Sequence, residues 1–318
     1  MRLAVVIPTL NESDNLPETV SRLRSALVRA GPKHADAPIV VADCGSSDGT
    51  PETARALRCA VIEGPTLTCR AAAMNAGATW AGDRVDVLWF VHADTHVGPR
   101  CCQELLGALR RPGVVGGTFD FAWRAAGCGR LDQRLVMAAL RLGNRLRYHV
   151  THNFYGDQTL FVRRDAFKAV GGYPDRLLLE DIAICRALKK LGRLVIARCI
   201  VQTSPRRFVD NGILRQWLFD MVLLACDRVG IEPRTLHLRY NSVNRQRTSR
   251  VAREDAEPGG QAAEEIRMGD AHHPAARDRH AMNGRACVSR RRPAATWPGD
   301  RPRRAASGRA ATARRRCR

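Results

Sequence analysis

The sequence lacks the features that define membrane-spanning, secreted and metal-finger proteins. No apolar run reaches the ~18–20 residues of a spanning helix, because charged residues interrupt the nearest candidate, Ile213 to Val229. The 11 cysteines include no CxxC pair. The first apolar run stops at Pro8, which is too short for a secretory signal. We therefore expect reduced thiols and a cytoplasmic protein, with peripheral contact at the inner face of the membrane left open.

Acidic residues are also scarce, with 31 Asp and Glu against 52 Lys and Arg, so the net charge is +21. Residues 242–318 hold 19 Arg and eight acidic residues, which leaves +10 for residues 1–241. The same segment has no Leu, Phe or Tyr, and it cannot bury enough apolar surface to offset its ordering entropy. We predict one folded domain over 1–241 and a disordered basic tail over 242–318. This charge suits anionic partners such as nucleotide diphosphates, lipid phosphates or nucleic acid.

The first hundred residues alternate between strand and helix patterns. Leu3 to Ile7 is a continuous apolar run, as in a strand buried on both faces. Strands are expected over residues 3–7, 39–42, 59–63, 85–91, 157–162 and 194–201. Helices are expected to begin after residues 13, 50 and 69, and two further helices are expected over residues 131–146 and 179–191. Such alternation predicts a parallel sheet covered by helices, with the active crevice at the carboxyl ends of the strands.

Two helix starts carry recognisable signals. Ser13 or Asp14 can cap the first helix, and Pro17 suits its first turn. Thr50 can cap a later helix, with Pro51 at its first position.

Acidic residues follow two of the expected strands. Asp43 opens a loop rich in Gly and Ser, where its carboxylate can accept hydrogen bonds from a ligand or serve as a turn residue. Asp94 ends the stretch His92-Ala-Asp94, and a carboxylate there can bind Mg²⁺ together with substrate phosphates, or cap a turn. His92 projects to the same side as Asp94 and suits a donor contact, a metal ligand or simple packing.

A third acidic site, Glu180-Asp181, opens the helix expected after Leu177 to Leu179. Carboxylates in a first turn are favoured by the helix dipole, so a structural role is one reading. The other reading is a general base that takes a proton from an attacking hydroxyl.

Six segments, in this order, together resemble one known family. They are Pro8-Thr-Leu-Asn-Glu12, Asp43 to Thr50 (DCGSSDGT), Arg70 to Ala78 (RAAAMNAGA), His92-Ala-Asp94, the stretch from Gly156-Asp-Gln158 through Val170-Gly-Gly-Tyr-Pro174 to Glu180-Asp181, and Thr203 to Phe208 (TSPRRF). Their order and spacing are similar to glycosyltransferase family 2, especially a bacterial subgroup with HAD in place of the DXD metal motif. The resemblance covers residues 2 to 241.

The resemblance implies a GT-A fold, in which a Rossmann-like, mixed but mostly parallel sheet is flanked by helices. It also implies an inverting transferase that moves a sugar from a nucleotide-diphosphate sugar to a hydroxyl acceptor, either lipid-linked or a small molecule, with Mn²⁺ or Mg²⁺. The roles it implies are donor binding for Pro8, Glu12, Asp43, Arg70, Asn75, His92, Arg206 and Arg207, metal binding for Asp94, catalysis for Asp181 with Glu180 beside it, and a sugar or acceptor pocket at Gly156, Asp157 and Gln158.

Two departures from the family pattern bear on this interpretation. His92 replaces the first aspartate of the metal motif, and Cys44 replaces the second aspartate of the loop, which normally contributes to the pyrimidine contact.

Two other functions are compatible with part of the pattern. A nucleotidyltransferase also combines an α/β sheet with a metal-bound aspartate, although it usually has a Gly-rich basic loop after its first strand. A nucleic-acid binder could use the Arg-rich tail, although Trp297 is the only aromatic residue there.

Overall fold

The structure is a computed structural model that describes residues 1–124, 136–143, 145, 154, 158–176 and 178–229, without the side chain of Arg207. Its strands are β1 (Leu3–Thr9), β2 (Ile39–Asp43), β3 (Ala60–Glu63), β4 (Val87–Phe90), β5 (Thr95–His96), β6 (Val114–Trp123), β7 (Leu160–Arg163) and β8 (Arg193–Thr203). Its helices are α1 (Leu16–Arg29), α2 (Pro32–Ala35), α3 (Thr50–Ala56), α4 (Arg70–Ala81), the 3-10 turn Gly82–Arg84, α5 (Cys101–Leu109), α7 (Arg164–Ala169), α8 (Glu180–Leu188), α9 (Arg206–Asn211) and α10 (Ile213–Arg228).

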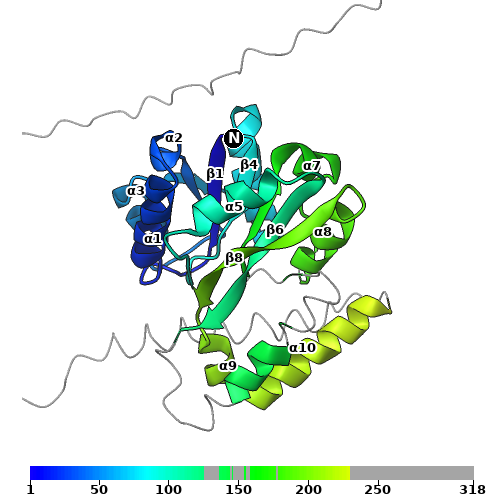
Figure 1. Ribbon diagram of the computed structural model, residues 1–318. Coiled ribbons are helices and arrows are strands. Elements are labelled where there is room, and N and C mark those ends of the chain that lie inside the picture. The colour runs from blue at the N-terminus through cyan, green and yellow to red at the C-terminus, as the bar shows by residue number, and fades with distance from the viewer. Residues whose placement is uncertain (125–135, 144, 146–153, 155–157, 177, 230–318) are drawn as a thin grey trace, which may run out of the picture. The chain divides into compact units, whose positions relative to one another are not determined.

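The strands form one mixed sheet in the order β3-β2-β1-β4-β7-β6-β8-β5. The pairs β3–β2, β2–β1, β1–β4 and β6–β8 are parallel, whereas β4–β7, β7–β6 and β8–β5 are antiparallel. Helices pack against this curled sheet (Figure 1). The predicted Rossmann-like, mostly parallel sheet flanked by helices is therefore confirmed.

The apolar run at the start forms the centre of the core. All seven residues of β1 are buried, as expected for a strand covered on both faces. Helix α4 approaches β1 closely, since a Cβ added at Gly77 would lie 2.3 Å from a methyl group of Val6. The small residues of the RAAAMNAGA segment thus allow the helix to lie directly on the central strand.

The sequence patterns missed β6, a strand of ten residues. Its signal is weakened by Gly116 and Gly117, which resemble loop residues. The structure explains both, because a Cβ added at Gly116 would lie 2.7 Å from the carbonyl oxygen of Phe161, and one at Gly117 would lie 2.2 Å from that of Val195. Close approach of neighbouring backbones therefore requires glycine at these two positions.

Both predicted helix caps were wrong by one or two residues. Asn15 is the N-cap of α1, and the backbone N–H of Ser13 donates to Asp48 in the neighbouring loop. Gly49 is the N-cap of α3 with a left-handed backbone, and Thr50 is already helical. The hydroxyl of Thr50 is used inside the loop, where it donates to Asp48 and accepts from the backbone N–H of Glu12.

Among the described residues, no helix combines the length and the apolar character needed to cross a membrane. The helix predicted over 131–146 is described only in part, with residues 136–143 helical. The predicted domain end at 241 and the basic tail over 242–318 lie outside the described residues. They stay predictions.

Candidate functional site

Most of the predicted site residues gather at one edge of the sheet. The parallel strands β1, β2 and β4 all end there, and Thr9 lies opposite Asp43 in the register of β1 and β2. Pro8 is buried in β1, one residue before that pair. The segment from His92 to Asp94 continues from the end of β4, and the carbonyl of Ala93 accepts a hydrogen bond of 2.6 Å from the hydroxyl of Thr19 in α1.

Asp43 is buried and holds the loop that follows β2. Its carboxylate accepts hydrogen bonds from the Thr9 hydroxyl at 2.8 Å, from the backbone N–H groups of Gly45 and Ser46 at 3.0 and 2.7 Å, and from the Ser46 hydroxyl at 2.5 Å. A carboxylate has about four lone-pair positions, and these four donors use them. In this structure Asp43 fixes the shape of the loop, and its direct contact with a nucleotide stays a prediction.

Cys44 replaces an aspartate of the family pattern with a neutral group. Burial raises the pKa of its thiol to about 11, and the charge of neighbouring Asp43 adds to the shift. The thiol is therefore protonated at neutral pH. This loop carries one negative charge fewer than the family loop does at the same place.

Glu12 and Arg206 meet although 194 residues separate them. Arg206 Nη2 lies 3.0 Å from Glu12 Oε1, and Asn15 donates to the other oxygen of Glu12 at 2.7 Å. Glu12 is largely buried, whereas the Arg206 side chain is 43% exposed. The fold thus brings together two residues that the resemblance assigns to donor binding, and leaves the guanidinium accessible to an anion.

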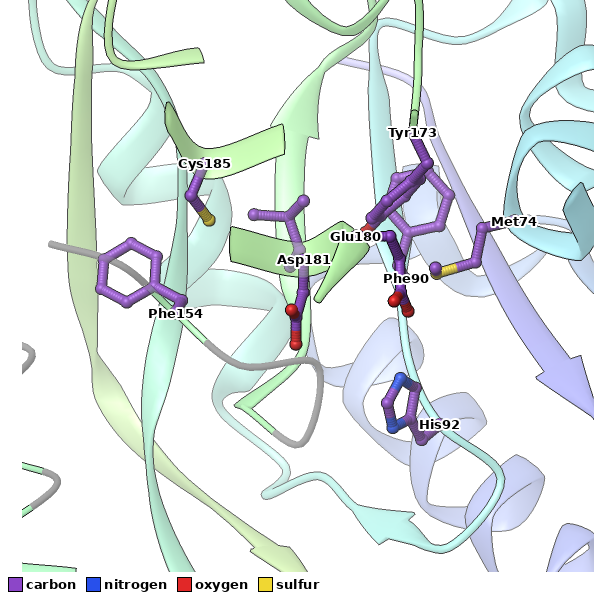
Figure 2. A pocket seen from close by; sticks show the side chains of 9 residues that line it. Met74, Phe90, His92, Phe154, Tyr173, Glu180, Asp181 and Cys185 are labelled. Carbon is purple, nitrogen blue, oxygen red and sulfur yellow. The ribbon is translucent and has the colours of Figure 1, made fainter. Parts of the chain in front are cut away.

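A small pocket unites three other predicted residues. It is lined by His92 and by Glu180 and Asp181, the first two residues of α8. Apolar side chains and a thiol form the rest of its wall: Met74, Phe90, Phe154, Leu160, Tyr173 and Cys185. Figure 2 shows the carboxylates of Glu180 and Asp181 directed to the same side, where the ring of His92 lies. One histidine and two carboxylates therefore share a largely apolar pocket.

Glu180 is almost completely buried, with 1% of its surface exposed. One of its oxygens, Oε1, forms an ion pair with Nε of Arg70, the first residue of α4. The other oxygen, Oε2, is buried and has no hydrogen-bond partner among the described residues. Buried polar atoms are almost always satisfied, so this oxygen is placed to accept a hydrogen bond from a group bound in the pocket.

Asp181 is less buried than Glu180. Its Oδ1 accepts a hydrogen bond of 2.7 Å from the backbone N–H of Ile182. Leu179, the residue before the helix, has a left-handed backbone with φ of 59°. The left-handed backbone of Leu179 thus fixes how the chain enters α8, and with it the direction of the two carboxylates in the first turn.

Asn75 braces one side of the pocket. Its side-chain amide donates to the carbonyl of Tyr173 at 2.8 Å and accepts from the N–H of Tyr173 at 2.9 Å. Gly172 must be small here, since an added Cβ would lie 2.7 Å from the Asn75 amide oxygen. In the structure Asn75 thus positions Tyr173, and contact with the donor stays a prediction.

Tyr173 was not assigned a role from the sequence, although it lies in the quoted VGGYP segment. Burial raises the pKa of its hydroxyl well above the usual value, with further contributions from Cys185, Glu180 and Asp181. The group therefore stays protonated, and its ring stacks edge-on against Phe90 with centroids 5.1 Å apart. The pocket's aromatic wall, including Phe154, carries no sequence signal that separates it from ordinary core residues.

Asp94 lies in the turn after β4, where the N–H of Thr95 donates to the carbonyl of His92. It is partly exposed. Within the described part of the chain, no group of three or more His, Cys, Asp or Glu is arranged to hold a metal ion. A single carboxylate can hold Mg²⁺ or Mn²⁺ only where substrate phosphates supply further oxygen ligands. This is the usual arrangement for Mg²⁺ in phosphate sites.

The residues predicted for the sugar or acceptor pocket are described only in part. Gln158 is fully buried, and its amide donates to the carbonyl of Phe119 at 3.1 Å. It thereby ties the start of β7 to β6. Gly156, Asp157 and the side chain of Arg207 lie outside the described residues.

The fold and this edge of the sheet define an α/β protein with a carboxylate-rich site at the ends of parallel strands. The family model of glycosyl transferase family 2 matches residues 4–171, which is more than half of the chain. The chain belongs to this family.

Three solved structures have a similar fold over part of the chain. A mannosyltransferase from Pyrobaculum calidifontis, in complex with GDP-Man and Mn²⁺, shares 20% identity at a TM-score of 0.46, and the match covers 63% of this chain and 56% of that one. Glucosyl-3-phosphoglycerate synthase from Mycobacterium tuberculosis, with Mn²⁺, UDP and glucosyl-3-phosphoglycerate, shares 19% identity at a TM-score of 0.42, covering 64% and 70%. TarS from S. aureus, in complex with UDP, shares 15% identity at 0.44, covering 65% and 62%. A comparison with curated proteins found no match.

Proposed function

We propose that this protein is an inverting glycosyltransferase, which moves a sugar from a nucleotide-diphosphate sugar to a hydroxyl group. The observation that carries the proposal is the shared pocket of His92, Glu180 and Asp181, at the same edge of the sheet as the loops of Glu12 and Asp43. Membership of glycosyl transferase family 2 supports the same chemistry. The acceptor is either a small molecule or a lipid-linked one.

In this proposal the donor's nucleotide binds along the loops that follow β1 and β2. Asp43 keeps the second loop in shape through its four internal hydrogen bonds. Cys44 contributes no charge, so a hydrogen bond to the base from this position is weaker than one from a carboxylate. Arg206, held by Glu12, meets the diphosphate, for which its planar guanidinium is well suited.

A divalent ion, Mn²⁺ or Mg²⁺, would be held by Asp94 together with diphosphate oxygens. When bound, such an ion neutralises negative charge on the leaving nucleoside diphosphate. His92 is two residues away and faces the pocket of Glu180 and Asp181. We therefore assign His92 to the donor side of the pocket.

Asp181 is the proposed general base. A single in-line displacement with inversion requires a group that takes the acceptor's proton on the face opposite the leaving group. Asp181 is partly exposed and directed into the pocket, so an acceptor hydroxyl can reach it (Figure 2). Glu180 is buried and paired with Arg70, which makes it a positioning residue for the first turn of α8.

The test is a panel of nucleotide sugars incubated with the full-length protein and Mn²⁺, with the released nucleotide identified by chromatography. We expect one or a few donors to be turned over, slowly by water and faster with an acceptor, with release of a nucleoside diphosphate. Release of pyrophosphate from a nucleoside triphosphate and a sugar phosphate would instead show a nucleotidyltransferase. A chain lacking 242–318 is the control, because transfer by the folded domain survives this deletion and a function in the basic tail does not.

A further inference from the structure

Helix α10 exposes a row of large apolar side chains. Leu214, Leu218 and Val222 are exposed at intervals of four residues, Val229 follows seven residues later just after the helix ends, and Trp217 is exposed beside Leu218. Leu214 is 68% exposed, and Leu218 and Val222 are about half exposed, at 51% and 50%. Residues spaced in this way form one stripe along a helix.

The opposite face of α10 is turned toward the protein and combines the apolar Leu223, which is 3% exposed, with polar side chains. Gln216 is 4% exposed, accepts a hydrogen bond from Asn211 and donates one of 2.8 Å to Asp220. Near the end of the helix, the Asp227 carboxylate lies 3.0 Å from Arg176 and 2.7 Å from Arg186 of α8, with only 5% of its side chain exposed. The ion pairs of Asp227 and the buried Leu223 thus hold α10 on the domain, and its row of exposed apolar side chains faces outward.

A continuous exposed apolar stripe of this kind usually marks a binding surface. Figure 1 shows α10 at the margin of the domain beside α9, while the other labelled helices lie against the sheet. We therefore expect a partner to bind this surface, and the charged residues around it indicate the chemistry of that partner.

We propose that the outward face of α10 binds an anionic lipid surface. Arg215 and Arg228 are exposed near the two ends of the helix, while its acidic residues, Asp220 and Asp227, lie on the inward face. Such a combination of apolar stripe, Trp217 and flanking arginines is what interfacial helices use on anionic membranes. A second copy of the chain would bring equal positive charges together, since residues 1–241 carry a net charge of +10.

The surface lies next to the proposed donor site. Helix α9 carries Arg206, which pairs with Glu12, and only Gly212 separates α9 from α10. Lipid binding would hold this edge of the site close to the membrane. The proposal itself depends on the geometry of α10 and not on the transfer reaction.

The test is co-flotation of the full-length protein with phosphatidylcholine vesicles, prepared with and without phosphatidylglycerol. We expect binding to the anionic vesicles, and we expect Leu218→Glu and Val222→Glu each to reduce the bound fraction roughly tenfold, because each loses apolar contact and adds a negative charge. Val28→Glu is the matched control, since Val28 is 61% exposed on α1 and should leave binding unchanged. Thermal unfolding followed by circular dichroism is measured in parallel and reports that each variant is folded.

The Arg-rich tail is the main competing source of vesicle binding. Binding through the tail alone is electrostatic, so it would be lost at high salt and would be equal in Leu218→Glu and the wild type. Equal binding of these two proteins overturns the proposal. A wild-type dimer that Leu218→Glu converts to a monomer in light scattering also overturns it, because a second copy would then be the occupant.

A fluorescence measurement adds an independent readout. Trp217 lies in the stripe and is 37% exposed. Its emission should shift to shorter wavelength on anionic vesicles, and Trp217→Phe should abolish that shift although Trp80, at 40% exposure on α4, is unchanged. A shift that persists in Trp217→Phe places the contact elsewhere and contradicts the proposal.

Discussion

Arg70 and Glu180 form an ion pair between the first residues of α4 and α8, across 110 residues of sequence. Glu180 is almost fully buried, whereas about a third of the Arg70 side chain is exposed. The pair joins the helix of the donor half to the helix that carries the proposed base. Both helices thereby face the same pocket.

This ion pair predicts an asymmetric mutational pattern. Arg70→Ala leaves a buried carboxylate without its partner and should destabilise the protein more than Glu180→Gln, which removes the charge and keeps the shape. Chemical denaturation of the two single variants and the double variant measures this. Losses of stability in the two single variants that simply add up in the double variant would show that the pair is not coupled.

Asp181→Asn should reduce the transfer rate by about 10²–10⁴-fold, the usual contribution of a general base. Donor affinity should change little, since the amide keeps the shape of the side chain. Rate measurements at saturating donor, with donor binding followed by calorimetry, separate these effects. Glu180→Gln is the comparison, and a larger loss of rate in that variant than in Asp181→Asn would identify Glu180 as the base.

Removal of divalent metal should stop transfer, and Mn²⁺ or Mg²⁺ should restore it. Asp94→Ala should raise the metal concentration needed for half-maximal activity or eliminate activity, because the remaining ligands would come from the donor alone. Titration of the chelator-treated protein with Mn²⁺ measures this. Full activity of the wild type in the presence of chelator would exclude a metal role for Asp94.

Arg206→Ala should weaken binding of a nucleoside diphosphate by roughly tenfold, since a hydrogen bond to a charged group contributes about 1.5–3 kcal/mol and this guanidinium is partly exposed. Arg206→Lys should restore only part of the affinity, because lysine lacks the planar fork. Calorimetric titration with UDP and GDP measures the change. Arg22→Ala, on the exposed surface of α1, is the control and should bind as the wild type does.

Cys101 and Cys199 should form a disulfide with each other when the protein is treated with a small-molecule disulfide. Their sulfur atoms lie 2.7 Å apart, between α5 and β8, and both are free thiols. The hydrogen bond from Cys101 lowers the pKa of Cys199, and Cys199 is the less buried of the two, so we expect Cys199 to react with the reagent first. Mass spectrometry of tryptic peptides detects the link, and recovery of only singly modified Cys199 would show that the two thiols cannot join.

The sequence by itself determined the strand and helix order of the donor half. The buried run at Leu3 to Ile7 and the small residues around Gly77 leave few alternatives to a covered parallel strand with a helix lying on it. Local apolar periodicity carries that information. The order of the six motifs then indicated the family, which the match over residues 4–171 confirms.

Tertiary structure alone decided which side chains meet. The pairs Glu12–Arg206 and Arg70–Glu180 depend on how distant segments fold onto one edge of the sheet, and no local pattern encodes such contacts. The strand β6 was hidden for the same reason, because its glycines are explained only by the backbones of Phe161 and Val195 beside them. The outward row of apolar side chains on α10 likewise appears only in the tertiary structure, because both faces of this helix carry apolar residues and only its contacts with Asn211 and α8 decide which face the protein covers.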